Sequence, residues 1–147
     1  MKFRNAFFMI LFVGYGFTLN AQISFENLQV GMNMEKRYIV MNISSRSCIY
    51  CLMQEKKMQK DKVLQERLKN EVYFLSWQTE QQVCFIFNGQ KYASGEEFIE
   101  NYGRDENGTI AYPLWLIFDE NYRIIYRYFG LLSTEKITKL LDVLKEK

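Results

Sequence analysis

Two hydrophobic periods alternate along the chain and divide most of it into strands and helices. Short, nearly continuous apolar runs predict strands at 38–43, 72–77, 114–119 and 123–129. Such runs are typical of strands covered on both faces. Apolar positions spaced three or four residues apart predict a short helix within 26–37 and an amphipathic helix over 134–146. Residues 22–25 are expected to form a further short strand.

Polar residues indicate where the other elements begin and where the chain turns. A charged segment predicts a helix from about Cys51 to Lys60. Three residues are expected to cap the helices that follow them, which are 62–68, 95–102 and 134–146: Asp61, Ser94 and Ser133. The dipeptide Asn88-Gly89 predicts a two-residue turn between strands at 83–87 and 90–93.

The order of these elements predicts the fold class. Strand, helix and strand over 38–77 imply a right-handed crossover and a parallel pair. The short links after residue 83 predict antiparallel hairpins instead. The domain is therefore expected to be α/β, with a mixed central sheet, parallel in its first half and antiparallel in its second, and helices on both faces.

Residues 1–21 differ in character from the rest. Lys2 and Arg4 precede an apolar run at 6–13, and Leu19-Asn20-Ala21 is a plausible cleavage site. We expect a signal peptide over 1–21 and one domain over 22–147, exported to a periplasmic or secreted location. An uncleaved membrane anchor is the alternative, but the apolar run is short for a bilayer and glycines interrupt it. We expect no stable membrane insertion after cleavage.

Charge and composition exclude several classes of function. The formal net charge of +2 comes from Lys2 and Arg4, so the predicted domain is formally neutral and gives no electrostatic basis for nucleic-acid binding. The chain contains no histidine, which excludes Ser-His-Asp and Cys-His catalysis and metal sites built on imidazole.

The candidate chemistry is the stretch Cys48-Ile49-Tyr50-Cys51, between a predicted strand and a predicted helix. A cysteine that opens a helix faces unpaired backbone N–H groups and the positive end of the helix dipole, which favour the thiolate. A second cysteine one turn later can close a disulfide. This pattern indicates dithiol/disulfide exchange. A static disulfide in a binding module and half of a zinc site are the alternatives, and zinc needs two further soft ligands.

The third cysteine, Cys84, lies within an apolar predicted strand. Free cysteine behaves as a small hydrophobe and is often buried, so we expect Cys84 to pack in the core or sheet. We therefore expect no metal site. Trp77 and Trp115 are expected in the core or lining a cleft. Four lysines are expected on the solvated side of the cysteine-bearing helix: Lys56, Lys57, Lys60 and Lys62.

The combination of the cysteine pair with Pro113, which precedes a strongly apolar strand, resembles the thioredoxin superfamily, especially its secreted thioredoxin-related proteins. The resemblance extends from Ile23 to the C-terminus and includes a closing hairpin, Gly130 and a last helix. It implies that Pro113 is cis and lies against the cysteine pair, and that Tyr112 offers its backbone to an incoming peptide.

The sequence departs from the family's pattern around the cysteines. Ser47 and Ser44 replace two aromatic residues, and Ile49-Tyr50 replaces Gly-Pro. Asn42 replaces a buried acid that in the family lies below the resolving cysteine. These departures argue against the general role of a cytosolic thioredoxin with its usual reductase.

The resemblance implies a thiol–disulfide oxidoreductase acting on exported protein disulfides or thiols. Cys48 would attack, Cys51 would resolve the mixed disulfide, and Tyr112 and Pro113 would bind substrate. No dissociable cofactor is expected, because electrons would pass to or from a partner thiol reductase or oxidase. Without an imidazole between the cysteines to stabilise the thiolate, we favour a reductant. A non-catalytic secreted module with a static disulfide is the alternative.

Overall fold

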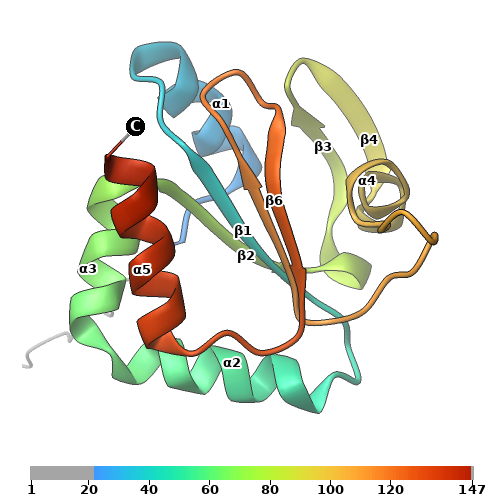
Figure 1. The fold of residues 1–147 in the computed structure, drawn as a ribbon. Coiled ribbons are helices and arrows are strands. Elements are labelled where there is room, and N and C mark those ends of the chain that lie inside the picture. Colours follow the sequence, from blue (N-terminus) through green and yellow to red (C-terminus); the bar gives the residue numbers. More distant parts are fainter. Residues whose placement is uncertain (1–21, 147) are drawn as a thin grey trace, which may run out of the picture.

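The computed structural model describes residues 22–146 of the 147-residue chain. Figure 1 shows a central sheet with helices on both sides. The elements are α1 (Phe25–Met34), β1 (Ile39–Ser44), α2 (Ile49–Lys60), α3 (Lys62–Glu71), β2 (Tyr73–Gln78), the 3-10 helix η1 (Thr79–Gln81), β3 (Val83–Phe87), β4 (Gln90–Ser94), α4 (Gly95–Tyr102), β5 (Leu114–Phe118), β6 (Ile124–Phe129) and α5 (Thr134–Lys145).

The central sheet has the strand order β2-β1-β5-β6. Strands β1 and β2 are parallel, whereas β1 with β5 and β5 with β6 are antiparallel. The predicted α/β class and mixed sheet are confirmed. The hairpin of β3 and β4 forms a separate two-stranded sheet. Its turn at Asn88-Gly89 has positive φ at both residues, as the predicted two-residue turn requires.

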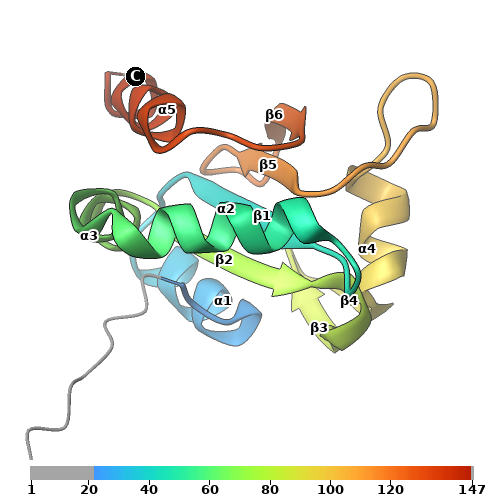
Figure 2. The same ribbon diagram turned by 90° about the horizontal axis from the view of Figure 1, so that it is seen from below.

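Each face of the central sheet has its own hydrophobic core. Helices α1 and α4 and the hairpin of β3 and β4 cover one face, and α2, α3 and α5 cover the other (Figure 2). Strand β1 contributes to both, because side chains alternate between faces. Met41 and Ile43 belong to the first core and Val40 to the second. By the same alternation Asn42 faces the layer of α2.

Side-chain caps fix the helix starts. Asp61, Ser94 and Ser133 each accept a backbone N–H of the first turn, which confirms the three predicted caps. The predicted strand at 22–25 is wrong. Ser24 accepts the N–H of Asn27 and so caps α1, and helix formation begins at Phe25.

The predicted signal peptide and its cleavage site lie outside the described residues. Within residues 22–146 no helix combines the length and apolar character needed to cross a membrane.

Candidate active site

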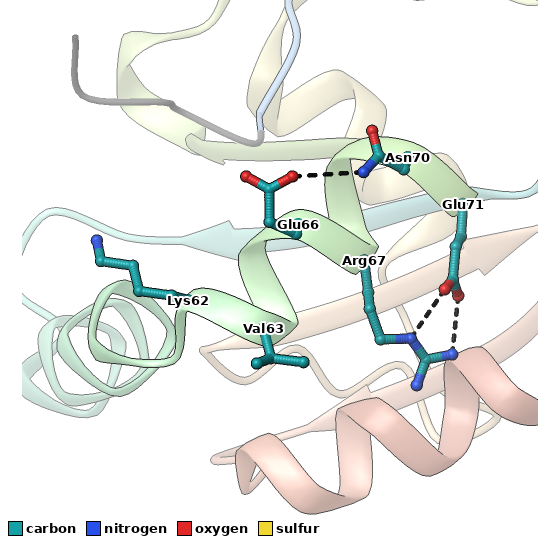
Figure 3. A pocket seen from close by; sticks show the side chains of 6 residues that line it. All are labelled: Lys62, Val63, Glu66, Arg67, Asn70 and Glu71. Carbon is teal, nitrogen blue, oxygen red and sulfur yellow. Dashed lines mark hydrogen bonds and ion pairs between the residues drawn. The ribbon is translucent and has the colours of Figure 1, made fainter.

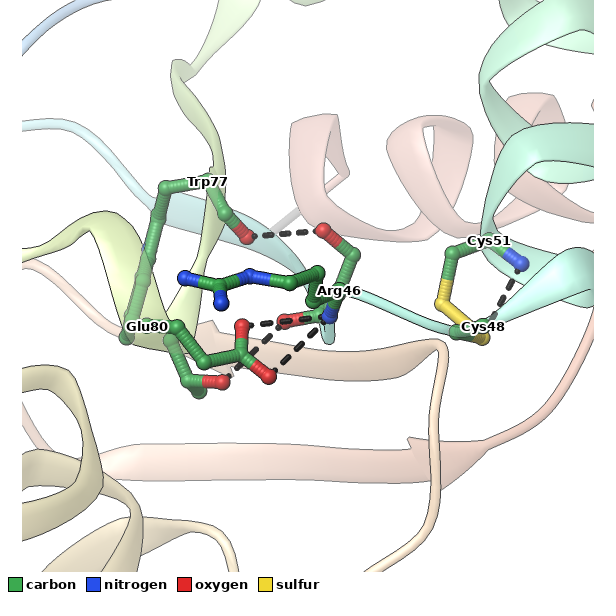
Figure 4. The surroundings of a disulfide bond; sticks show 7 residues. Arg46, Cys48, Cys51, Trp77 and Glu80 are labelled. Carbon is green, nitrogen blue, oxygen red and sulfur yellow. Dashed lines mark hydrogen bonds between the residues drawn. A yellow bond between two sulfur atoms is a disulfide. The ribbon is translucent and has the colours of Figure 1, made fainter.

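Cys48 and Cys51 form a disulfide across the first turn of α2, with their Cα atoms 5.2 Å apart. Cys48 is the N-cap residue of this helix, and its Sγ accepts the N–H of Cys51 at 3.1 Å (Figure 4). Cys51 is buried, whereas Cys48 is partly exposed. An approaching sulfur atom therefore meets Cys48 before Cys51. The N–H that stabilises the Cys48 sulfur is one that a thiolate would also use.

A carboxylate positions the loop that leads to Cys48. The backbone N–H of Arg46 donates to both carboxylate oxygens of Glu80, at 3.0 and 3.1 Å (Figure 4). These hydrogen bonds lower the pKa of Glu80, so the carboxylate is ionised at neutral pH. Glu80 lies in η1, directly after β2. Because β1 and β2 are parallel, their carboxyl ends meet at one edge of the sheet, and this is where the loop and Glu80 come together.

Gln54 holds α2 against the segment that precedes α5. Its side chain is completely buried, and its amide pairs with both backbone groups of Leu132: Nε2 donates to the carbonyl at 3.0 Å, and Oε1 accepts the N–H at 2.8 Å. The helix that carries the disulfide is thereby fixed one turn after Cys51. Sequence reasoning missed Gln54 and Glu80, because glutamine and glutamate in exposed-looking segments carry no pattern that marks them.

Asn42 is buried, with 3% of its surface exposed, on the sheet face covered by α2. Its Nδ2 and the Nε1 of Trp115, which lies opposite it in β5, donate no hydrogen bond to any described residue. No aspartate or glutamate is buried among residues 22–146. The described core therefore contains an amide in place of a carboxylate that could accept a proton from a buried thiol.

The peptide bond between Tyr112 and Pro113 is cis, as the resemblance implied. Leu114 pairs with Ile43, so Pro113 enters the sheet at the end of β1 that leads to Cys48. The Pro113 carbonyl accepts the N–H of Gly130 at 2.8 Å. Burial raises the pKa of Tyr112, partly offset by a hydrogen bond with Thr79. The fold thus brings Tyr112, Pro113 and the disulfide to one edge of the sheet, and the part of the first two in substrate binding stays a prediction.

Cys84 is exposed, and the expectation that it packs in the core or sheet is wrong. Strand β3 directs Phe85 and Phe87 into the core, while Cys84 and Ile86 lie on its solvent side. The apolar run at 83–87 therefore has one buried face rather than two. Trp115 is fully buried, and Trp77 packs partly buried against the other core. The four lysines predicted to be solvated are exposed, but Lys62 begins α3 and does not belong to the cysteine-bearing helix α2.

Other features of the described surface offer less chemistry. An open hollow on α3 is lined by Lys62, Val63, Glu66, Arg67, Asn70 and Glu71 (Figure 3). Four of its polar residues pair with one another, since Arg67 pairs with Glu71 and Asn70 donates to Glu66. The hollow lies beyond the end of α2 that is distant from the disulfide. Within residues 22–146 no cluster of three or more Cys, Asp or Glu side chains is arranged to hold a metal ion.

A family model described as a thioredoxin-like domain matches residues 26–145. No curated protein matches the chain.

Solved structures share the fold at low sequence identity. A thioredoxin-fold protein from Helicobacter pylori is 19% identical with a TM-score of 0.53, and the match covers 86% of this chain and 72% of that one. Chloroplastic thioredoxin z is 12% identical with a TM-score of 0.56, over 86% and 94% of the two chains. A mutant thioredoxin from Halobacterium salinarum NRC-1 is 12% identical with a TM-score of 0.54, over 86% and 88%.

Proposed function

The chain belongs to the family of thioredoxin-like domains, and from this premise we propose that it is a thiol–disulfide oxidoreductase that reduces disulfides of exported proteins through Cys48 and Cys51. The observation that carries the proposal is the disulfide itself. It joins an accessible cysteine at a helix N-terminus to a buried cysteine one turn later. A family match and a cysteine pair of this geometry support thiol–disulfide exchange in general, and the reducing direction and exported substrates are the proposal.

The reaction follows from the different exposure of the two sulfurs. The Cys48 thiolate attacks one sulfur of a substrate disulfide, forms a mixed disulfide, and releases the other substrate sulfur as a thiolate that takes up a proton. Cys51 then loses its proton and attacks the Cys48 sulfur, which releases the second substrate thiolate. Two electrons and two protons pass to the substrate, and the Cys48–Cys51 disulfide forms. A partner dithiol protein returns the electrons.

The reducing direction rests on what stabilises the Cys48 thiolate. Strong oxidants in this chemistry have a highly stabilised thiolate, which favours the reduced form of the protein. Here Ile49 and Tyr50 offer no charged or imidazole group, and the side-chain group that holds the loop before Cys48, the Glu80 carboxylate on the Arg46 N–H, is an anion that does not stabilise a thiolate. A modestly stabilised thiolate favours the disulfide form of this protein and hence reduction of its substrates.

We propose that substrates dock at the edge of the sheet that the disulfide shares with the Tyr112–Pro113 peptide. The segment before β5 enters the sheet beside the carboxyl end of β1. Its backbone near Tyr112 would pair with an extended substrate segment, and such pairing suits a protein that accepts many substrates, because main-chain hydrogen bonds do not depend on side chains.

Turnover of a model protein disulfide tests the proposal. With dithiothreitol as the electron source, the purified protein should accelerate insulin reduction, and Cys48→Ser should abolish this activity. Cys84→Ser is the matched control, because it removes an exposed thiol on the other face of the sheet. Loss of activity in Cys84→Ser alone, with Cys48→Ser still active, would refute the assignment of the site.

Trapping tests the order of the two steps and the exported substrates. Cys51→Ser should accumulate mixed disulfides with proteins of the export compartment, since attack survives while resolution is lost. If non-reducing gels recover no protein adducts from this variant, the alternative of a binding module with a static disulfide is favoured.

A further inference from the structure

Helix α2 buries few of its large apolar side chains. The residues it buries are Cys51, Gln54 and Met58. Four large apolar side chains of its first half face solvent instead: Ile49 at 67% exposed, Tyr50 at 58%, Leu52 at 54% and Met53 at 42%. No other part of residues 22–146 covers them. An amphipathic helix ordinarily shows the reverse arrangement.

The charges of the same helix follow in its second half. Lys56, Lys57 and Lys60 are exposed, and Glu55 is the only acidic residue of α2. At 3.6 residues per turn, Ile49, Met53, Lys56 and Lys60 form one stripe along the outward side. Starting at the disulfide, the stripe is first apolar and then basic.

We infer that this stripe binds an extended segment of the disulfide substrate, one that carries apolar residues beside its reactive cysteine and acidic residues farther along. The inference rests on the proposed function, because the apolar end of the stripe adjoins the disulfide. Acidic residues are expected because their charge complements that of the lysines in the stripe. Lys56 and Lys60 lie about 12 and 18 Å from Cys48 along the helix at 1.5 Å per residue. An extended chain covers that distance in roughly four to six residues.

A membrane surface is the other class of partner that apolar and basic side chains attract. On α2, however, the two kinds of residue succeed one another along one stripe, and the disulfide lies at the apolar end. A bilayer that accommodated Ile49 and Met53 would also cover the disulfide, which must stay accessible for exchange. The geometry therefore favours a peptide.

Peptide substrates test the inference on the purified, reduced protein. Each peptide carries one cysteine as a mixed disulfide with thionitrobenzoate, flanked by apolar residues. Four to six positions from the cysteine, either before or after it, the peptide carries two aspartates, two asparagines or two lysines. Cys48 attacks the peptide sulfur and releases coloured thionitrobenzoate. Cys51 then displaces the peptide thiolate, which takes up a proton, so one disulfide is reduced by one dithiol.

Only one direction of the peptide along α2 places the aspartates over Lys56 and Lys60. With the aspartates on that side of the cysteine, the peptide should react about five- to tenfold faster than its asparagine counterpart at low salt, because two exposed ion pairs each contribute modestly. The preference should shrink as salt screens it. Lys56→Glu combined with Lys60→Glu should reverse it in favour of the lysine peptide. The control, Lys36→Glu combined with Lys91→Glu, changes the net charge equally at exposed positions outside α2 and should keep it.

The apolar half is tested in the same assay. Ile49→Ser combined with Met53→Ser, which removes the two apolar residues of the stripe, should slow every apolar peptide by a similar factor. Val30→Ser combined with Met34→Ser, which removes exposed apolar side chains from α1, should not.

The outcomes separate the two proposals. Equal rates for aspartate, asparagine and lysine peptides would overturn the stripe while leaving thiol–disulfide exchange in place. If the protein reacts with none of the peptides and also fails to react with a small aromatic disulfide, the proposed function and the stripe are overturned together. Cosedimentation with phosphatidylglycerol vesicles that is lost in the Lys56→Glu and Lys60→Glu variant would assign the stripe to a membrane and overturn the peptide.

Discussion

The two faces of the central sheet are packed in contrasting ways. The face covered by α1, α4 and the β3–β4 hairpin is a cluster of interlocking aromatic rings centred on Phe98, which contacts Phe25, Phe87 and Tyr102 among others. The face covered by α2, α3 and α5 is mainly aliphatic and includes two buried amides, Asn42 and Gln54. Only the second face lies beneath the helix that carries the disulfide.

This contrast separates stability from chemistry. Aromatic rings bury large areas and hold one another in specific geometries, which suits a face that only has to be stable. A buried amide is costly unless it is hydrogen-bonded, and sequences place such groups where position matters. Gln54 fixes α2, and Asn42 lies beneath its layer. Variants within the ring cluster around Phe98 should thus change stability alone, and variants of the two buried amides should also change disulfide exchange.

Phe98→Ala should produce the largest effect. Its ring is fully buried among other rings, so its removal should lower the free energy of unfolding by about 3–5 kcal/mol. Urea denaturation measures this change. The folded fraction of the variant should keep the disulfide-exchange rate of the unmodified protein. A large change in that rate would contradict the proposed difference between the two faces.

Gln54→Leu should destabilise less but change the site. The leucine keeps the volume but leaves the N–H and carbonyl of buried Leu132 without their partners, which costs about 2–3 kcal/mol. Because α2 loses its anchor one turn after Cys51, we also expect an altered rate of mixed-disulfide resolution. Gln65→Leu is the control, because it removes a partly buried hydrogen bond from α3 to the Met58 carbonyl, at the end of α2 that is distant from the disulfide. Equal effects of the two changes on resolution would remove the positioning role of Gln54.

Asn42→Asp tests whether the buried amide limits proton transfer. In the unmodified protein the exchange rate should climb from about pH 6 to pH 9 as thiols ionise near their ordinary pKa of about 8.5. A carboxylate at this position should flatten the profile by acting as a base. It should also cost about 1–3 kcal/mol. Burial would raise its pKa, so this loss should grow as pH rises above the ordinary aspartate pKa. Identical stopped-flow profiles would show that Asn42 does not face the dithiol.

Tyr102 should give the smallest effect, confined to the aromatic face. Burial and the neighbouring Tyr92 hydroxyl raise its pKa to about 12 from 10 in the unfolded chain. The folded state therefore favours the neutral phenol, and this contribution to stability is present in full below pH 10 and lost as pH rises towards 12. Denaturation curves at several pH values across this range should show a free energy of unfolding that declines less steeply with pH in Tyr102→Phe than in the unmodified protein. An unchanged decline would assign the alkaline loss to other groups.

Most of the fold was predictable because its signals are local. The continuous apolar run of β1 predicted a strand covered on both faces, and Asp61, Ser94 and Ser133 predicted helix starts, as the structure confirms. The N-terminal residues were not predicted correctly, since Ser24 serves equally well in a strand or as a cap, and the local pattern does not distinguish the two.

The site was predictable only as far as its covalent pattern. Cys48 and Cys51 stand out by spacing, and Pro113 by its place before β5. Glu80 and Gln54 were missed because their roles come from tertiary contacts with Arg46 and Leu132, across 34 and 78 residues of chain. Cys84 was misplaced because an apolar run does not reveal whether one or both faces of a strand are covered.

The reduction potential of the Cys48–Cys51 disulfide tests the central claim most directly. It is measured by equilibrating the protein with graded ratios of reduced and oxidised glutathione or dithiothreitol and counting free thiols in Cys84→Ser, where only this pair contributes. A redox-active pair that acts as a reductant should lie between about −300 and −200 mV, in the range of thioredoxins and glutaredoxins. A value far below about −300 mV would mark a static structural bond and contradict the account.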